Sequence, residues 1–339
     1  MKSFSQLYFD NTHKVAHKWS AYLSQYDRIF SSKRNLPIKL LEIGVQNGGS
    51  LEIFSEYFFN AQKIIGIDIN PNCRNLKFNN SVISVIVGDV NSNSIKSTLL
   101  SSSDGFDFII DDGSHISGDI IKSFCFYFKN LNEDGIYIVE DLHCSYWKEF
   151  NGGLYFPYSS VSFFKKIIDV LNSEHWGIEK DLENFLNGFT NIYGVELDWL
   201  VLKQIHSIEF LNSMCIIRKK GAEENTLGVR VISGLEERVS GGHFSLDMGT
   251  IQVPSQIDNE WTDIAVAPDE KYIDLLNEVK DLKEQLRSLN KLLTERSQRI
   301  SELDAFIFDI ISSTSWKITA PFRRIVNFIK YFKKAASRI

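Results

Sequence analysis

Cysteine is scarce in this chain of 339 residues, which contains only four. Cys73, Cys125, Cys144 and Cys215 form no C-x-x-C pair and no short metal-binding spacing, and each lies in or beside an apolar segment. We therefore expect buried free thiols in a reducing cytosol.

Long apolar runs are also absent, although 43% hydrophobic residues suffice for a sizeable core. No stretch of about 18 apolar residues occurs, and the opening MKSFSQLYFDNTH lacks a cleavable secretory pattern. The sequence predicts a cytoplasmic protein, with peripheral contact at the inner face of the cytoplasmic membrane left open.

Charge is unevenly distributed along the chain. The net charge is −6, but residues 312–339 hold seven Lys and Arg and no acid, so the remainder has 30 basic against 43 acidic residues. An acidic body argues against a nucleic-acid-binding surface. Only the cationic tail calls for an anionic partner.

Short β-type apolar runs recur from residue 37 onward. KLLEIG, KIIGIDI, VISVIVGD, FDFIIDD and GIYIVED alternate with longer helical or mixed segments. This order predicts a doubly wound, Rossmann-like α/β fold with a mostly parallel sheet. IHSIEF and SMCIIRK are separated by two residues, which predicts an antiparallel hairpin that closes the sheet.

Two flanking segments have different patterns. Residues 1–35 have helical spacing through Trp19, Leu23, Tyr26 and Phe30, and we expect a helical cap. Residues 221–268 hold six of the twenty glycines, which predicts a linker or small accessory lobe.

Heptads predict a coiled coil over residues 269–311 and a homo-oligomer formed through it. The alternative is one amphipathic helix packed on its own domain, but a 3.5-residue repeat this long would drift off such a partner. The number of strands is not fixed. The core positions are Leu275, Val279, Leu282, Leu286, Leu289, Leu293, Arg296, Ile300, Leu303, Ile307 and Ile310.

Residues 312–339 predict a basic amphipathic helix that begins near Pro321. Such a helix fits an anionic membrane surface, whereas a solvated end or a dock for an acidic protein are the alternatives. The apolar positions are Phe322, Ile325, Val326, Ile329, Phe332 and Ala336, and the basic ones are Arg323, Arg324, Lys330, Lys333, Lys334 and Arg338.

Glycines follow the first predicted strand in LLEIGVQNGGSLEIF. Glu42, Gly44, Gly48 and Gly49 stand where the chain turns from strand to helix. Glycines there allow a ligand to approach the backbone, although such turns join strands to helices in many folds. We assign Glu42, Gly44 and Gly48 to cofactor binding.

Single acids end the next strands. Asp68 can accept both ribose hydroxyls of a nucleoside, and Asp89 can lie near an adenine edge. Each acid could equally be a helix cap or turn residue. A rim of acids without Arg or Lys suits a pyrophosphate poorly and suits the cationic sulfonium of S-adenosylmethionine well. Asp111, at the end of the fourth strand, joins the cofactor side.

Paired acids end the fourth and fifth strands. Asp111 and Asp112 should converge with Glu140 and Asp141 beyond the carboxyl ends of the sheet. Neighbouring carboxylates repel unless a cation neutralises them, and neither motif contains Lys or Arg. Mg²⁺ is the natural cation for oxygen ligands.

A histidine follows the first acid pair. The turn after Asp112 would aim His115 at a substrate oxygen, where an imidazole can accept a proton while the metal assists. We assign His115 and Asp112 to catalysis, with His143 as a competing base or an orienting residue. A capping or supporting hydrogen-bond role for His115 and a structural role for the acids are the alternatives.

Together these motifs resemble a known enzyme family. LLEIGVQNGGSL, GIDI, IIDDGSH, DIIKSF, GIYIVEDLHCSYW and HSIEFLNSM are similar to metal-dependent sugar O-methyltransferases of the macrocin and mycinamicin type, which belong with the cephalosporin hydroxylase and rhamnosyl O-methyltransferase group. The resemblance covers residues 8–218. It implies a class I methyltransferase domain over residues 36–220, magnesium bound by Asp112, Glu140 and Asp141, and His115 as the general base.

Two further segments qualify the resemblance. The family often has Thr-Asp-Lys before a His and a Tyr, whereas this chain reads NTHKVAHKW, with His13 in place of the acid and Trp19 after His17. Family contacts there are therefore not carried over. SSTSWKITAPFRR resembles a tail segment of bacterial glycosyltransferases and other surface-polysaccharide assembly proteins.

The sequence thus predicts methyl transfer from S-adenosylmethionine to a sugar hydroxyl, with Mg²⁺, in bacterial surface polysaccharide (O-antigen or capsule-like) biosynthesis. The acceptor would be a glycan or a nucleotide- or lipid-linked sugar. One rival is a metal-binding hydroxylase or other sugar-modifying enzyme on the same fold. Another is a non-catalytic coiled-coil scaffold, which the complete acid set and His115 oppose.

Overall fold

The computed structural model describes residues 1–180, 185–262 and 268–336. The chain forms two compact units, residues 1–265 and 266–339. The strands are β1 Lys39–Ile43, β2 Lys63–Asp68, β3 Ile83–Val87, β4 Phe106–Asp111, β5 Leu131–Val139, β6 Ile205–Leu211 and β7 Met214–Lys219. The helices of the first unit include α1 Phe4–Phe9, α2 Ser20–Phe30, α3 Gly49–Tyr57, α4 Asn93–Ser102, α5 Ser117–Tyr127, α6 Ser160–Leu171, α8 Asn187–Tyr193 and α9 Trp199–Leu202.

The first unit is built on one seven-stranded sheet with the order β3-β2-β1-β4-β5-β7-β6. Strands β1 to β5 are parallel, and β7 is antiparallel to both of its neighbours. Each of the five apolar runs forms a parallel strand, and the two later runs form the β6–β7 hairpin. The predicted doubly wound sheet and its closing hairpin are confirmed.

The register of the central strands determines where the site forms. Ile43 at the end of β1 pairs with Asp111 of β4, and Asp111 pairs with Val139 of β5. The residues that follow these three strands therefore emerge side by side at one edge of the sheet.

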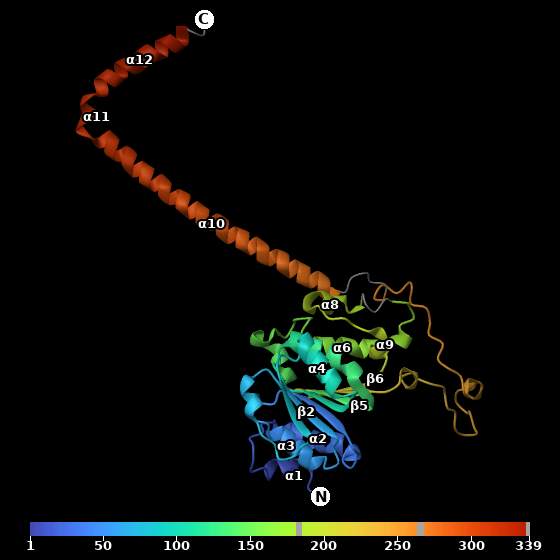
Figure 1. Ribbon diagram of the computed structural model, residues 1–339. Coiled ribbons are helices and arrows are strands. Elements are labelled where there is room, and N and C mark those ends of the chain that lie inside the picture. Colours follow the sequence, from blue (N-terminus) through green and yellow to red (C-terminus); the bar gives the residue numbers. More distant parts are fainter. Residues whose placement is uncertain (181–184, 263–267, 337–339) are drawn as a thin grey trace. The chain divides into compact units, whose positions relative to one another are not determined.

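One face of the sheet is covered by α1, α2 and α3 (Figure 1). Phe4, Tyr26 and Phe54, one from each helix, pack ring against ring, with centroids 5.2 to 6.1 Å apart. Phe30 of α2 reaches Phe108 of β4 at 4.8 Å. The segment expected to form a cap thus contributes two helices to the main core.

The opposite face is covered by α4, α5 and α6 (Figure 1). Phe124 of α5 packs on Tyr137 of β5 at 5.3 Å and on Phe164 of α6 at 5.2 Å. Because both faces of the sheet are buried, the central strands are apolar at consecutive positions such as Ile109 and Ile110, without polar alternation.

Residues 221–262 are mostly exposed and contain turns and two short 3-10 helices, η7 Ala222–Glu224 and η8 His243–Leu246. The backbone amide of Gln256 donates to the Gly177 carbonyl at 2.9 Å, and the backbone amide of Met248 donates to the Arg230 carbonyl at the same distance. Elsewhere in this unit the four cysteines are free, with Cys125 less buried than the other three.

The second unit is helical, with α10 Pro268–Ser312, α11 Thr314–Ile318 and α12 Ala320–Ala336. Helix α10 carries every predicted heptad position, and within this chain the side chains of Leu289 and Leu293 are 62% and 66% exposed. Within the described ranges, no helix combines the length and apolar character needed to cross a bilayer. Arg338 of the predicted tail lies outside the described residues.

Residues 14 and 15 of the N-terminal segment lie directly against Gly49 at the start of α3. A Cβ at Gly49 would stand 2.3 Å from the Lys14 carbonyl oxygen. Gly49→Ala should therefore lower the free energy of unfolding in urea by about 1–3 kcal/mol, the usual cost of overpacking. Gly153→Ala is the matched control, because its Cβ would meet only Phe156 at 3.5 Å. Equal stability of the two variants would contradict this packing.

Candidate active site

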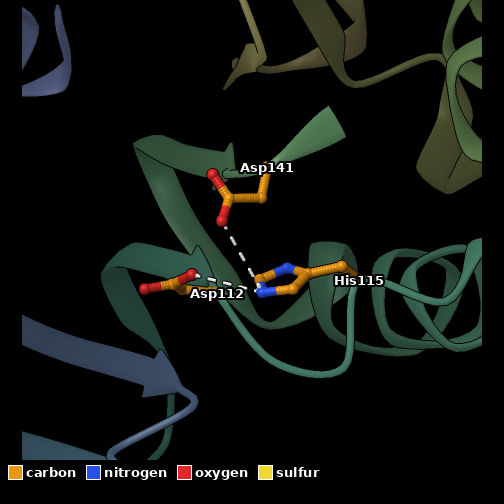
Figure 2. A group of neighbouring side chains, drawn as sticks. All are labelled: Asp112, His115 and Asp141. Atoms are coloured by element: carbon orange, nitrogen blue, oxygen red, sulfur yellow. Dashed lines mark ion pairs between the residues drawn. The ribbon is translucent and has the colours of Figure 1, made fainter. Parts of the chain in front are cut away.

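The turns after β4 and β5 bring three predicted residues together (Figure 2). His115 Nε2 lies 3.9 Å from Asp112 Oδ1 and 3.7 Å from Asp141 Oδ2. One ligand atom from each side chain lies within 4.8 Å of the other two. Two carboxylate oxygens and an imidazole nitrogen at this spacing can hold a divalent cation or move a proton.

Both turns hold a non-glycine residue in the left-handed region, with φ of 58° at His115 and 54° at Asp141. Such a conformation costs on the order of 1–3 kcal/mol and requires support from the surroundings. In the first turn, Ser114 Oγ donates to Asp119 Oδ2 at 2.8 Å and accepts from the Ile116 amide at 3.3 Å. These bonds support the turn that carries His115.

Asp141 is held directly by Tyr22, which is itself hydrogen-bonded to Ser213, and no sequence motif marks either residue. The Tyr22 hydroxyl lies 2.8 Å from Asp141 Oδ1 and 2.8 Å from Ser213 Oγ. His143 Nδ1 is hydrogen-bonded to the same Ser213 hydroxyl and lies 4.0 Å from Asp141 Oδ1. His115 therefore faces Oδ2 of Asp141, whereas His143 belongs to the group around Oδ1.

A buried lysine enters the site from the N-terminal segment. Lys18 has a side chain only 2% exposed, with Nζ 2.6 Å from Asp112 Oδ2, 2.7 Å from Glu140 Oε1 and 3.6 Å from Glu42 Oε1. Tyr26 donates its hydroxyl hydrogen to the same Glu140 oxygen. Neither acid motif contains Lys or Arg, so the sequence points to a metal as the cation; the structure adds Lys18, which comes from a distant part of the chain.

The electrostatics of this cluster keep Lys18 charged. Burial lowers the pKa of Lys18, but the carboxylates of Asp112 and Glu140 outweigh it and raise the pKa well above its ordinary value. Burial raises the pKa of Glu140, and the lysine opposes that rise. Burial also raises the pKa of Glu42 to about 7, again opposed by Lys18. Lys18 is thus an ammonium ion among acids.

A cavity of about 270 Å³ is lined by Asp112, one of the three residues of Figure 2. Asp112 and Ser114 contribute to its lining, so the cavity and the acid pair share a wall. Four residues assigned to the cofactor line it: Gly44, Asp68, Asp89 and Asp111. Burial raises the pKa of Asp111 to about 7.

Two residues assigned to the cofactor do not line this cavity. Glu42 is fully buried and accepts a hydrogen bond from Ser50 Oγ at 2.6 Å. Gly48 faces the side chains of Phe78 and Leu76. The structure therefore places Glu42 with Lys18 rather than with the cavity.

Asp68 and Asp89 also organise their own loops. Asp68 Oδ2 accepts from the amides of Val45 and Gln46 at 2.9 and 2.8 Å. Asp89 Oδ1 accepts from the Asn91 amide at 2.9 Å. Both acids thus have the turn role that was the alternative to nucleoside binding, while they still line the cavity.

Gly44 is required by the chain's own backbone. Its φ is +96°, and a Cβ there would stand 2.0 Å from the Asp112 carbonyl oxygen. The absence of a side chain lets the turn after β1 touch the turn after β4. This contact joins the wall of the cavity at Gly44 to the turn that carries Asp112.

Aromatic side chains surround the two histidines. Trp19 and Trp147 are 51% and 49% exposed, and their rings lie 5.9 and 5.0 Å from the His143 ring. Phe150 lies 6.4 Å from the His115 ring. A second cavity of about 360 Å³ begins at His143 and continues to residues of β6 and α6. In the sequence, Trp19 stands out only as a helix position of the cap and as a departure from the family pattern.

Comparisons with known proteins identify methyltransferases that are similar to this chain. No protein-family model matches the chain. The chain is 32% identical over 165 residues to 8-demethyl-8-alpha-L-rhamnosyl tetracenomycin-C 2'-O-methyltransferase of Streptomyces olivaceus. The aligned region covers 46% of this chain and 43% of that protein. The chain is also 34% identical over 145 residues to demethylmacrocin O-methyltransferase of Streptomyces fradiae. This aligned region covers 40% of this chain and 36% of that protein. The chain thus spans less than half the length of these curated relatives.

A solved structure is similar in fold. The MycE methyltransferase from the mycinamycin biosynthetic pathway, in complex with Mg and SAH, is 25% identical with a TM-score of 0.52. The match covers 66% of this chain and 56% of that one. The expected resemblance is confirmed: the chain has the class I methyltransferase fold and is similar to the sugar O-methyltransferases of the macrocin, mycinamicin and tetracenomycin type.

Proposed function

We propose that this protein transfers the methyl group of S-adenosylmethionine to a sugar hydroxyl in a magnesium-dependent reaction. The observation that carries the proposal is the convergence of Asp112, His115 and Asp141 beside the acid-lined cavity. The similar proteins support it, because the curated relatives are named O-methyltransferases and the MycE structure holds Mg and SAH.

The cavity fits a cationic nucleoside. Asp68, Asp89, Asp111 and Asp119 all line it, which favours a sulfonium and disfavours a pyrophosphate. Oδ2 of Asp68 accepts from two backbone amides, whereas Oδ1 accepts from one, the Asn70 amide at 2.8 Å, and keeps acceptor capacity for a ribose hydroxyl.

The donor set at Asp112 and Asp141 fits magnesium. Both are carboxylates with side chains 17% and 19% exposed, so hard oxygen ligands are open to water and substrate. Magnesium, when bound, supplies the positive charge that favours an ionised acceptor hydroxyl. Glu140, the third acid of the expected set, faces Lys18 and Tyr26.

His115 is the proposed general base. Its Nε2 takes the proton of the acceptor hydroxyl, the new bond forms between that oxygen and the methyl carbon, and the bond from carbon to sulfur breaks. The sulfonium becomes the neutral thioether of S-adenosylhomocysteine. The carboxylates of Asp112 and Asp141, 3.9 and 3.7 Å away, stabilise the imidazolium.

The aromatic residues support a sugar acceptor. The half-exposed rings of Trp19 and Trp147 flank His143, and the apolar C–H face of a pyranose can pack on such rings. Hydroxyls at the edge of the sugar would then point toward the acids.

Two measurements with the whole chain test the proposal. S-adenosylhomocysteine should bind in calorimetric titration, and labelled S-adenosylmethionine should methylate members of a panel of free, nucleotide-linked and lipid-linked sugars when magnesium is present. Absence of S-adenosylhomocysteine binding at millimolar concentration would contradict the methyltransferase assignment.

Loss of a metal ligand should reduce turnover without loss of the cofactor. Asp141→Asn should lower activity by at least about 10–100-fold, the cost of disturbing even a supporting partner of a metal site, with partial recovery in excess magnesium. A chelator should act in the same way on the parent. Glu149→Gln removes an exposed acid nearby and serves as the control. Full activity in excess chelator would exclude the metal mechanism.

Loss of the base should slow the chemical step alone. His115→Ala should retain S-adenosylhomocysteine and metal binding but lower kcat by about 10²–10⁴, the usual contribution of a positioned base. His143→Ala should have a smaller effect, because His143 faces Ser213. If His143→Ala has the larger effect, the two assignments must be exchanged.

We further propose that the acceptor belongs to a bacterial surface polysaccharide or its precursor, and that the enzyme works in the cytoplasm. The support is the tail sequence SSTSWKITAPFRR, which resembles segments of polysaccharide-assembly proteins. Linkage analysis by mass spectrometry should find a methylated sugar in surface glycan only when the gene is intact.

Self-association through α10 is proposed from its exposed heptads, with a second copy as the partner. In a parallel, in-register pair, Glu278 at a g position faces Lys283 at an e position of the second copy. Arg299 faces Asp304 of the second copy in the same way. These pairs have opposite charges, so the sequence favours a parallel homo-oligomer.

Helix α12 is proposed to contact an anionic membrane surface. Phe322, Ile325 and Ile329 are exposed apolar residues of this helix, and Arg323, Arg324 and Lys330 lie beside them in sequence. Each basic residue near charged lipid contributes about 1 kcal/mol.

One set of variants separates the two helices. The pair Leu286→Asp with Leu293→Asp should reduce the oligomer in sedimentation, whereas Ser288→Asp should not. Truncation after Ser312 should keep the oligomer and abolish pelleting with anionic liposomes. A full-length protein that ignores liposomes at low salt would favour an acidic protein partner instead.

A further inference from the structure

The acids of the site face two separate cation positions. Glu140 Oε1 and Asp112 Oδ2 point at the ammonium of Lys18, at 2.7 and 2.6 Å. On the other side, Asp112 Oδ1 and Asp141 Oδ2 point at His115. Asp112 is the residue that the two positions share.

We propose that Lys18 is a resident cation of this site, that Glu140 is its counterion, and that exchangeable magnesium is held by Asp112 and Asp141 without Glu140. The inference rests on the proposed magnesium-dependent function. It assigns a charge-balancing role to a lysine that neither the sequence motifs nor the comparisons mark.

Burial separates Glu140 from the other two acids. Glu140 is 1% exposed, and its Oε1 already accepts from Lys18 and Tyr26. Magnesium usually keeps several of its waters and needs space for them. The side chains of Asp112 and Asp141 are 17% and 19% exposed, so the space for a hydrated ion lies on their side.

Lys18 occupies one side of Asp112. Its side chain is 2% exposed, and its ammonium lies among oxygens of three acids, including Glu42 at 3.6 Å. Oδ2 of Asp112 contacts this ion, whereas Oδ1 lies on the side of His115. The lysine therefore balances the charge of the buried acids and leaves Oδ1 of Asp112 to the exchangeable metal.

The pair of Lys18 and Glu140 can be tested because its two members have opposite charges. Removing one member leaves the other buried without its partner, which is strongly destabilising. Removing both leaves the net charge of the site unchanged. Lys18→Met combined with Glu140→Gln therefore tests ligation by Glu140 without the electrostatic effect of a changed net charge.

Manganese binding, followed by electron paramagnetic resonance, is the first readout. The double variant Lys18→Met, Glu140→Gln should bind Mn²⁺ within about threefold of the parent affinity. Asp141→Asn should weaken Mn²⁺ at least about tenfold, as expected for a direct ligand. The affinity for S-adenosylhomocysteine should be the same in both variants as in the parent. An unchanged affinity shows that the variants are folded.

Thermal unfolding without metal is the second readout. Lys18→Met alone should lower the melting temperature by roughly 5–15 °C, and adding Glu140→Gln should restore much of the loss. This cycle requires neither metal nor activity, so it reports on the pair even if the proposed function fails.

The outcomes are distinguishable. If the double variant loses Mn²⁺ as strongly as Asp141→Asn, Glu140 is a metal ligand and the inference is overturned while the proposed function stands. If Glu140→Gln restores no stability to Lys18→Met, the two residues are not a pair and the inference is also overturned. If the parent itself binds no Mn²⁺, the metal part of the proposed function and this inference fall together.

Discussion

The contact between the buried Lys18 ammonium and the acids at the strand ends is the interaction on which the rest of the site depends. Glu42, Asp112 and Glu140 come from three adjacent strands or their ends, and the parallel register forces them together. Carboxylates at such distances repel strongly where water is excluded. A fixed positive charge makes the arrangement possible, and the N-terminal segment supplies it.

The remaining geometry follows from rigid supports on either side of that contact. Gly44 lets the turn after β1 touch Asp112, and Gly49 lets residues 14 and 15 pass over the start of α3. Asp141 keeps its left-handed backbone between Tyr22 from α2 and Ser213 from the β6–β7 turn. Every functional side chain of the proposed site thus stands at the end of a regular element or on a short turn between two.

The sequence predicted the features that depend on local pattern. Apolar runs identified the strands, and the rule that ligands bind beyond their carboxyl ends brought Asp112, His115 and Asp141 together. Lys18, Tyr22 and Ser213 escaped notice because no local pattern marks a side chain that acts through a distant contact. Gly44 and Gly49 were found but were ascribed to a ligand's approach, whereas the chain's own backbone fills the space beside them. Glu42 was placed with the cofactor because a strand-end acid gives no sign of being fully buried.

The separation of Lys18 from its partners along the chain has a consequence for synthesis. The lysine leaves the ribosome 94 residues before Asp112 and 122 residues before Glu140. Phe30 of α2 likewise waits for its partner Phe108 of β4. A nascent chain therefore exposes apolar side chains of α2 and a Lys18 without its acid partners until most of the sheet has been made. Transiently exposed apolar surface of this kind is where chaperones bind and misassembly begins. The acid cluster can thus be completed only after β5 has been made, although its cation precedes β1 in the sequence.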